Sequence, residues 1–380
     1  MVRIGIVGLG CVGLSVVEIL NKHADLLAQR CGRELVVQRG VVRDLGKKRS
    51  VGFALSTDIN ALLDDPQIDL IVELSGQVDL AYKLATKALE QGKGFITANK
   101  AMLAKHQKLI HSPIGFEASV GGGIPLIKAL KEGLASNAII SIQGVVNGTC
   151  NFILEQMSGG SSFEDALKQA QELGYAEANA HLDISGQDSA HKLLILSSLA
   201  FGGQIALEGV AVRGIEGTSN ADLMHAKRLG YTLKLLVQAH KSVSGLALSV
   251  GPVLLPQGHL LAQIKGVMNG AIVVGDFVGE TFYYGAGAGG LATASAVVND
   301  IVDFCKQRHT PKPTTLNKIA TAPTPPTPHY VRLAQAMPKN IPATLHFCVG
   351  QEHIYTTPPT SLAYLQEHLG TGAQIYPILA

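Results

Sequence analysis

The sequence predicts an α/β protein in which a doubly wound parallel sheet is joined to a second, mixed α/β domain. Two observations support this prediction. In the first third of the chain, short apolar segments alternate with segments of helical periodicity, which is typical of parallel strands connected by helices. From about Pro125 onward, longer strand-like segments alternate with helices, which indicates a different kind of sheet.

The first domain is assigned to residues 1–124 and is expected to be completed by about residues 285–309. Its strands are expected at residues 2–8, 35–43, 69–75 and 94–97, and its helices at residues 13–27 and 80–91. A doubly wound sheet binds its ligand at the carboxyl ends of the strands. The residues that follow these strands are therefore the first candidates for a site.

The second domain is assigned to residues 125–284. Its helices are expected at residues 124–135, 162–173, 187–201 and 222–228, and its strands at residues 139–146, 234–239 and 270–278. This pattern indicates a mixed α/β domain with an open sheet. The apolar sheet needs a cover, and a homodimer is the expected cover.

Residues 310–329 contain six prolines and are interpreted as a stiff, extended linker. The remaining tail, residues 330–380, is expected to hold strands at residues 330–334, 344–349 and 374–378 and a helix at residues 361–369.

Composition narrows the class of protein. The net charge is +2 without a basic stripe, which argues against nucleic acid as a partner. Five scattered cysteines, odd in number and never in a CxxC pair, favour reduced thiols. The sequence has no unbroken run of about 18 apolar residues, the length that a membrane-spanning helix needs. The N-terminus also lacks the pattern of a signal peptide. We therefore expect a soluble cytoplasmic protein that acts on a small molecule.

The turn after the first predicted strand has the glycine spacing of a dinucleotide site. The first glycine, Gly8, permits a tight turn, Gly10 lets a pyrophosphate approach the backbone, and Gly13 lets helix and strand pack closely. The backbone of Cys11 and Val12 opens the helix whose N-terminus would hold the phosphate charge. The motif predicts a Rossmann-type dinucleotide-binding domain, although a structural glycine turn in another α/β fold remains an alternative.

The end of the second predicted strand bears on the choice of nicotinamide cofactor. Arg43 follows this strand, and a guanidinium there suits a 2′-phosphate, which favours NADP. Asp44 keeps NAD possible, and Arg43 pointing into solvent is the alternative. The neighbouring cluster of Lys47, Lys48 and Arg49 is interpreted as a solvated loop.

A lysine stands against the apolar helix predicted at residues 187–201. Lys192 lies one helical turn after Asp188 and directly precedes the run LLIL. A buried lysine can act as a proton donor, and Asp188 could orient it. The alternative is structural: Ser185 and Asp188 have the spacing of a capping box, and Asp188 with Lys192 forms an i,i+4 pair worth about 0.3–0.5 kcal/mol.

Several motifs in the same order resemble one enzyme family. The segments ITANKAMLA, FEASVGGGIPLIKAL and VVNGTCNFIL, together with the stretch around Lys192, are similar to homoserine dehydrogenase over residues 2–304. The resemblance implies NAD(P)H-dependent reduction of L-aspartate 4-semialdehyde to L-homoserine, on the pathway to threonine and methionine. Many relatives end in an ACT domain, and the short tail is interpreted as a reduced, ACT-like version.

The resemblance also implies roles for particular residues. Lys192 would transfer the proton, assisted by Lys100 of the TANK motif and oriented by Asp188. The residues that would bind the substrate are Glu177, Asp183, Asn147, Gly148 and Thr149.

Further contacts to the cofactor would come from Ser75, Lys100, Gly174 and Gly289. A family cation site would use the Glu117 carboxylate with the backbone carbonyls of Val120, Gly122 and Ile124. Oxygen ligands of this kind suit a hard cation such as Na⁺.

Two rival functions stay open from the residues. Aspartate semialdehyde dehydrogenase acts on the same aldehyde through a cysteine thioester, for which Cys150 is the candidate thiol; its other interpretation is a small apolar filler. A non-catalytic, nucleotide-sensing regulator is the rival of another class.

Overall fold

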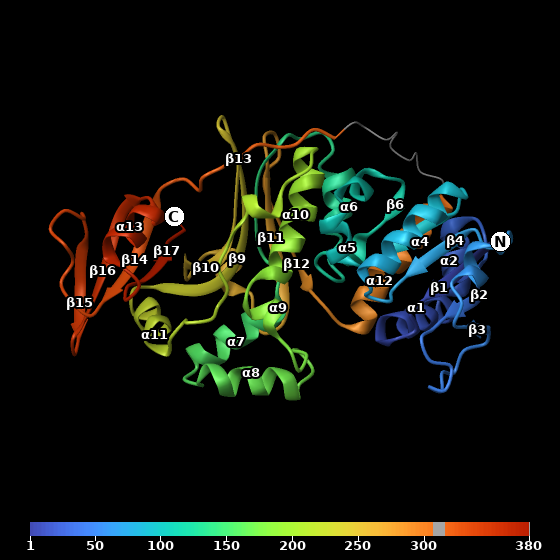
Figure 1. Ribbon diagram of the computed structural model, residues 1–380, viewed down its shortest axis with the longest axis horizontal. Helices are drawn as coiled ribbons and strands as arrows, with labels where there is room; N and C mark the ends of the chain where they lie inside the picture. The colour runs from blue at the N-terminus through green and yellow to red at the C-terminus, as the bar shows by residue number, and fades with distance from the viewer. Residues whose placement is uncertain (307–315, 380) are drawn as a thin grey trace. The chain divides into compact units, whose positions relative to one another are not determined.

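The computed structural model describes residues 1–306 and 316–379. The chain forms two compact units, one made of residues 1–138, 194–205 and 283–318, and the other of residues 139–193, 206–282 and 319–380. Two of the five boundaries fall inside an element: the one after Leu193 divides a helix, and the one after Phe282 divides a strand. Figure 1 shows the elements of each unit along the chain. Part of the predicted linker, up to residue 315, and Ala380 lie outside the described residues.

The first unit contains a six-stranded parallel sheet with the strand order β3-β2-β1-β4-β5-β6. This order is that of a doubly wound dinucleotide-binding sheet, and it confirms the predicted fold class. The two outer strands are only two or three residues long and were not predicted. The strands are β1 (Val2–Val7), β2 (Leu35–Val41), β3 (Ala54–Ser56), β4 (Leu70–Glu73), β5 (Gly94–Thr97) and β6 (Ile114–Gly115).

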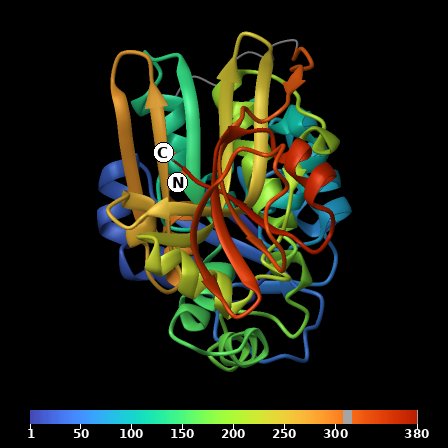
Figure 2. The ribbon, with the colours of Figure 1, turned by 90° about the vertical axis from the view of Figure 1, so that its left-hand side faces the viewer.

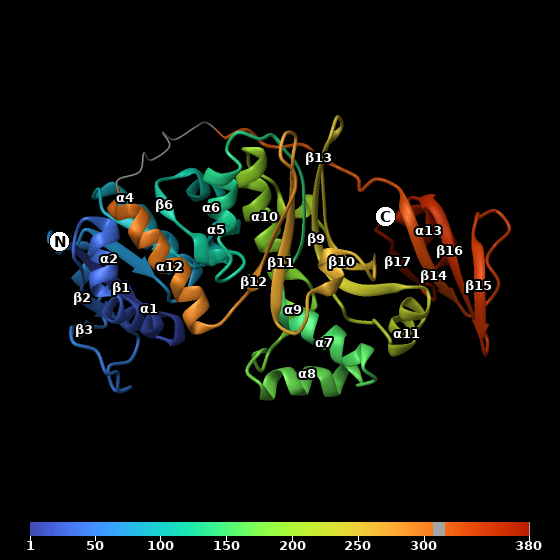
Figure 3. The same ribbon diagram turned by 180° about the vertical axis from the view of Figure 1, so that it is seen from behind.

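Helices cover this sheet, and a late segment of the chain joins them. Helix α12 lies against α1 and α2 in Figure 3, and the three share a core with alternate residues of β1 and β4. The helix predicted at residues 13–27 is two helices, because His23 leaves the helical conformation at φ −114° and ψ 27°. The helices are α1 (Cys11–Lys22), α2 (Ala24–Cys31), α3 (Asn60–Leu63), α4 (Val78–Glu90), α5 (Lys100–Lys105), α6 (Leu126–Lys128) and α12 (Gly290–Cys305).

The helix predicted at residues 124–135 is also different in the structure. Three α-helical residues in α6 are followed by a π-helical turn (Ala129–Gly133), in which the Leu134 amide donates to the Ala129 carbonyl at 2.8 Å. Short 3₁₀ turns precede it at Gln107–His111 and Glu117–Ser119. A π-turn has no signature in apolar spacing, so the periodicity indicated a longer regular helix.

The second unit is built on a mixed, seven-stranded sheet. Its path is β12-β11-β7-β9-β10-β13, and β8 pairs with β10. Figure 2 shows the long β9 and β10, which pair antiparallel from Tyr231 opposite Pro256 to Ser242 opposite Gly245. The strands are β7 (Ile139–Val145), β8 (Ala211–Val212), β9 (Tyr231–Ser242), β10 (Gly245–Pro256), β11 (Met268–Gly275), β12 (Gly279–Ala286) and β13 (Thr321–Ala322).

Strand β10 was not predicted because its sequence contains Pro252, which argues against a central strand. The structure explains this proline. On the side away from β9, β10 pairs with β13 at residues 246–247, with β8 at residues 249–250 and, through an isolated bridge to Ile378, at Leu254. Pro252 lies between these pairings, so its missing amide interrupts none of them.

The helices of the second unit surround the candidate site. Helix α7 begins at Gly148, where the sequence had been interpreted only as a turn. Helix α10 has the predicted bounds. The helices are α7 (Gly148–Ser158), α8 (Phe163–Glu172), α9 (His181–Ile184), α10 (Gln187–Phe201) and α11 (Asn220–Arg228), with 3₁₀ turns at Leu207–Gly209 and Leu260–Gln263.

The C-terminal tail forms a separate antiparallel sheet, ordered β15-β16-β14-β17, on which α13 packs. Strand β14 begins at Thr327, inside the range predicted as a linker. Strand β16, which contains two prolines near its end, was not predicted. The likeness of the tail to an ACT domain stays a prediction. The elements are β14 (Thr327–Leu333), β15 (Thr344–Val349), β16 (Glu352–Thr360), α13 (Leu362–Leu369) and β17 (Gln374–Pro377).

A buried histidine makes the tail sensitive to acid. His329 on β14 is 1% exposed, and burial lowers its pKa from 6.5 to about 4. Between these pH values the unfolded chain binds more protons than the folded chain, so the free energy of unfolding falls as the pH is lowered through the window. For a shift of this size the loss is on the order of 3 kcal/mol.

We expect His329→Gln to remove this part of the acid loss, measured by urea unfolding across the same pH window. His346→Gln is the matched control, because His346 is an exposed imidazole of the same sheet. If both variants lose stability in acid as steeply as the parent protein, His329 is not the titrating group.

Candidate functional site

The glycine turn has the geometry that a dinucleotide needs. Gly8 has φ +92°, and a Cβ there would lie 2.6 Å from the Leu74 carbonyl. A Cβ on Gly13 would lie 2.1 Å from the Gly8 oxygen, so this position also needs glycine. Gly10 is the N-cap of α1 and faces open space, since a Cβ there would meet no atom within 4 Å. The first residues of α1 therefore present a helix N-terminus to an uncovered surface.

An arginine that the sequence reasoning assigned to solvent lies at this turn. The Arg49 guanidinium donates to the carbonyl of Leu9 at 3.2 Å and to the carbonyls of Asp44 (2.8 Å) and Lys47 (3.0 Å). The segment is an exposed loop, as predicted, but Arg49 itself is half-buried and is held by these carbonyls. Arg43 is exposed just beyond the end of β2. Both arginines thus lie in the loop that follows β2, and Arg49 reaches from it to the glycine turn.

The residues after β4 and β5 are held by a buried carboxylate that the sequence reasoning missed. Glu73 is fully buried; its Oε1 accepts from the amide (2.7 Å) and hydroxyl (2.6 Å) of Ser75, and its Oε2 accepts from the Thr97 hydroxyl at 2.7 Å. The Thr97 oxygen in turn accepts from the Asn99 amide at 3.0 Å. Glu73 is the last residue of β4 and so lies at the carboxyl edge of the parallel sheet, where ligands bind. This position in the sequence could have identified it as a candidate.

Lys100 is the first residue of α5, directly after this network. Asn99 caps the helix, because its side-chain oxygen accepts from the Met102 amide at 3.0 Å. Gly289, another predicted cofactor contact, is the N-cap of α12 with φ +113°. Ser75, Lys100 and Gly289 therefore lie at strand ends or helix starts, although the amides of Ser75 and Lys100 already donate to Glu73 and to the Ala98 carbonyl.

The second unit brings four of the predicted substrate and proton-transfer residues together. The Lys192 ammonium lies 2.7 Å from Asp188 Oδ2 and donates to the Val146 carbonyl at 2.6 Å. The Asn147 side-chain amide donates to Asp183 Oδ1 at 2.7 Å and to Asp188 Oδ2 at 2.9 Å. Lys192 is 8% exposed and Asp188 is 7% exposed, so the ion pair is largely dehydrated.

The Asn147-Gly148-Thr149 segment is fixed by local contacts. The Asn147 side chain caps α7 by accepting from the Cys150 amide at 2.9 Å, while the Thr149 hydroxyl donates to the Tyr175 carbonyl at 2.6 Å. A Cβ on Gly148 would lie 2.5 Å from the Val267 carbonyl. One asparagine thus both starts a helix and orients two carboxylates.

The capping box proposed for Ser185 and Asp188 is absent. Helix α10 begins at Gln187, and the buried Ser185 hydroxyl has no hydrogen-bond partner among the described residues. The carboxylate of Asp188 is directed to Lys192 and Asn147 instead. Of the two structural roles considered for Asp188, the capping box is excluded and the ion pair with Lys192 remains.

The loop that holds Gly174 and Glu177 is more open. Gly174 has φ +73°, and the Glu177 side chain is exposed. Gln171 donates to the carbonyls of Glu177 (3.3 Å) and Ala178 (3.2 Å). These hydrogen bonds hold the backbone of the loop rather than the Glu177 carboxylate, so the predicted role of this carboxylate stays a prediction.

Cys150 is not placed as a nucleophile. It is fully buried, and its thiol donates to the Asp183 carbonyl at 3.2 Å. Burial and the neighbouring Asp183 raise the pKa of Cys150 well above the usual thiol range. A protonated thiol without solvent access does not attack an aldehyde, which removes the thioester chemistry of an aspartate semialdehyde dehydrogenase.

The predicted cation site has a single acidic side chain. Glu117 is 4% exposed, and its two oxygens accept from the amides of Ile127 (2.9 Å) and Lys128 (2.8 Å). Gly122 has φ +57° and packs against the Gly287 carbonyl, while the Ile124 carbonyl already accepts from Leu126 at 2.8 Å. The described residues contain no group of three or more histidine, cysteine or acidic side chains that could share a metal ion.

Within residues 1–306 and 316–379, no helix combines the length and apolar character needed to cross a membrane.

Comparison with known proteins agrees with this geometry. Residues 8–112 match the NAD-binding domain of homoserine dehydrogenase, and residues 125–302 match the homoserine dehydrogenase family model. The chain is 49% identical over 312 residues to the homoserine dehydrogenase of Helicobacter pylori, covering 80% of this chain and 74% of that one.

Solved structures give the same result. The homoserine dehydrogenase of Thiobacillus denitrificans superposes with a TM-score of 0.92 at 36% identity, covering 100% of this chain and 98% of that one. A hyperthermophilic archaeal homoserine dehydrogenase mutant in complex with NADPH superposes with a TM-score of 0.70 at 27% identity. The match covers 82% of this chain and 99% of that one. The chain belongs to the homoserine dehydrogenase family.

Proposed function

We propose that this protein catalyses the reversible, NAD(P)H-dependent reduction of L-aspartate 4-semialdehyde to L-homoserine. It is then an oxidoreductase acting on a CH–OH group, in the biosynthesis of threonine and methionine. The observation that carries the proposal is the buried Lys192 ammonium, held between Asp188 and the Val146 carbonyl in a chain of this family. A purely nucleotide-sensing regulator would not need this dehydrated ion pair.

Lys192 performs the proton transfer in this proposal. The nicotinamide, when bound, exchanges a hydride with the carbon that carries the substrate oxygen. Lys192 has three N–H donors, and its contacts to Asp188 and Val146 use two of them. The third donates a proton to the aldehyde oxygen in reduction and takes up the hydroxyl proton in homoserine oxidation.

The other polar groups position the substrate. Asp183, Asp188 and Glu177 supply negative charge for the substrate's ammonium group, and Asn147 sets the angle between the two aspartates. Gly148 and Thr149 complete the start of α7 beside them. Lys100, at the start of α5, assists at the substrate or the nicotinamide.

The residues of the first unit fit a nucleotide cofactor. Gly10 leaves open space at the helix start, so a pyrophosphate can approach the amides of residues 11–13. We infer a preference for NADP, because Arg43 and Arg49 supply two guanidinium groups where a 2′-phosphate would lie. Ser75, Gly174 and Gly289 complete the predicted contacts.

An activity assay tests this function. We expect the purified protein to oxidise L-homoserine with NADP⁺, and less efficiently with NAD⁺, as followed by nicotinamide absorbance. L-serine and L-threonine serve as controls for specificity. Failure to oxidise homoserine with either cofactor would overturn the proposal.

A structural Na⁺ at Glu117 belongs to the same proposal. In the parent protein, Na⁺ should raise the midpoint of urea unfolding relative to choline at equal ionic strength. Glu117→Gln should abolish that increase, because a neutral amide at this position cannot supply the negative charge. Glu208→Gln, which replaces an exposed carboxylate, is the control. An equal Na⁺ effect in all three proteins would exclude Glu117 as a ligand.

We also infer a homodimer, because Ile140 and Phe282 of the mixed sheet, and Phe277 in the turn between β11 and β12, are exposed on the single chain. Light scattering of the purified protein tests this inference. A cytoplasmic location stays a prediction, supported by the scattered cysteines.

A further inference from the structure

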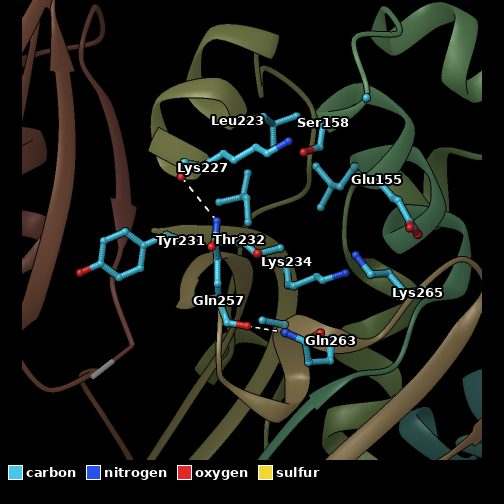
Figure 4. Close-up of a pocket in the computed structure, with 14 residues that line it drawn as sticks. Glu155, Ser158, Leu223, Lys227, Tyr231, Thr232, Lys234, Gln257, Gln263 and Lys265 are labelled. Carbon is cyan, nitrogen blue, oxygen red and sulfur yellow. Dashed lines mark hydrogen bonds between the residues drawn. The ribbon is translucent and has the colours of Figure 1, made fainter. Parts of the chain in front are cut away.

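A polar cavity lies in the second unit, apart from the group formed by Lys192, Asp188, Asn147 and Asp183. It has a volume of about 380 Å³ and is bounded by the C-terminal half of α7, by α11, by the start of β9 and by the turn at Leu260–Gln263. Figure 4 shows its charged lining residues, Glu155, Lys227, Lys234 and Lys265. Neither Lys192 nor Asn147 lines it, so it is not the site described above.

The most informative residue in this cavity is a buried lysine. Lys234 on β9 is 3% exposed, and its ammonium donates to the Asn151 side-chain oxygen at 2.7 Å and to the Ile264 carbonyl at 2.6 Å. Both acceptors are neutral, so the charge itself is not balanced by them. An ammonium has a third N–H donor, and Lys234 is part of the cavity wall.

The charges around Lys234 leave an excess of positive charge. Among the described lining residues, three lysines stand against a single carboxylate, Glu155, which already accepts from the Gly266 amide at 2.5 Å. In Figure 4 the Lys265 side chain points toward the Lys234 ammonium, while Lys227 points toward Ser158. Burial lowers the pKa of Lys234 to about 8. The Glu155 carboxylate opposes this shift, and the neighbouring Lys265 adds to it. Like charges directed at one another in a polar cavity are stabilised when an anion lies between them.

We propose that this cavity binds a phosphate monoester of a small polar metabolite. A dianion matches the surplus of two positive charges, and lysine ammonium groups are common phosphate ligands. The volume exceeds that of a phosphate group, and the uncharged polar side chains of Thr232, Gln257 and Gln263 line the remainder for the organic part of the ligand. Aspartate semialdehyde and homoserine carry no phosphate, so the proposal does not depend on the proposed reaction.

Calorimetry on the full chain tests the proposal, with saturating NADP⁺ present so that the glycine turn is occupied. Glycerol 3-phosphate is the probe, inorganic phosphate tests for a free-phosphate site, and chloride at equal ionic strength controls for screening. We expect one saturable site per chain, with the ester bound more tightly than inorganic phosphate.

The variants identify the cavity. Lys227→Ala and Lys265→Ala remove exposed ammonium groups, and each should weaken binding of the ester by about tenfold or more. Lys241→Ala, an exposed lysine at the far end of β9, should bind as the parent does. Lys234→Met should abolish binding, but because this lysine is buried the two exposed lysines decide the result. No saturable binding, or binding unchanged in the Lys227→Ala/Lys265→Ala protein, would overturn the proposal.

Discussion

Lys192→Met lowers kcat for homoserine oxidation by about 10²–10⁴-fold, the usual contribution of a positioned proton-transfer group. Methionine keeps the length of the stem but removes the ammonium that lies 2.7 Å from Asp188. The NAD-binding domain lies in the other unit, so nucleotide binding should persist, as measured by quenching of NADPH fluorescence. The expected signature is therefore a loss in kcat with retained affinity for the cofactor.

A matched lysine separates this effect from a general effect of losing an ion pair. Lys168 also forms an i,i+4 pair on a helix, with Glu172 at 4.0 Å, but its side chain is 76% exposed. Lys168→Met should leave kcat unchanged and cost at most about 0.5 kcal/mol. Because Lys192→Met leaves Asp188 buried without its cation, circular dichroism must show that the variant is folded. A folded Lys192→Met protein with normal turnover would remove Lys192 from the mechanism.

The site shows which parts of it can be predicted from sequence. The Asp188–Lys192 pair follows from helical spacing beside an apolar run, and it forms as expected. The side-chain amide of Asn147 donates to Asp183 and Asp188, which lie 36 and 41 residues later in the sequence. No local sequence pattern encodes contacts over such separations. Long-range hydrogen bonds of this kind depend on how the chain folds back, so only the residue types could be anticipated.

The fold follows the same division. The parallel sheet was predictable because short apolar strands alternate with helices, as β1 and β4, each followed by a long helix, illustrate; the short β3 and β6 were missed. Strand β10 was missed, and the gap that accommodates its Pro252 lies between pairings with β8 and with Ile378, which are distant in the sequence. Arg49 was assigned to solvent because its neighbours are charged, yet its partners are backbone carbonyls that composition does not reveal.

Several polar contacts join the tail to the rest of the second unit, and a buried carboxylate takes part in the largest group of them. Asp222 on α11 is 2% exposed and receives the Arg332 guanidinium of β14 at both oxygens, with Nε–Oδ1 2.8 Å and Nη2–Oδ2 3.2 Å. The hydroxyls of Tyr330 and Tyr376 donate to the same carboxylate at 3.3 Å. Farther along, the Leu379 amide donates to the Leu254 carbonyl of β10 at 2.9 Å.

Arg332→Met is therefore expected to reduce the free energy of unfolding by about 3–5 kcal/mol, because it leaves a buried carboxylate without its cation. Asp222→Asn/Arg332→Met removes both charges and should recover much of this loss, whereas Arg30→Met, an exposed arginine on α2, should change stability by less than about 0.5 kcal/mol. Urea unfolding followed by far-ultraviolet circular dichroism measures all three. Unchanged stability of Arg332→Met would mean that the other contacts, such as the hydrogen bonds from Arg213 to Ile375 and from Leu379 to Leu254, suffice to hold the tail. A double variant no better than the single one would mean that Asp222 tolerates its charge unpaired. If both expectations hold, the ion pair between Arg332 of the tail and Asp222 of α11 contributes to the stability of the second unit as a whole.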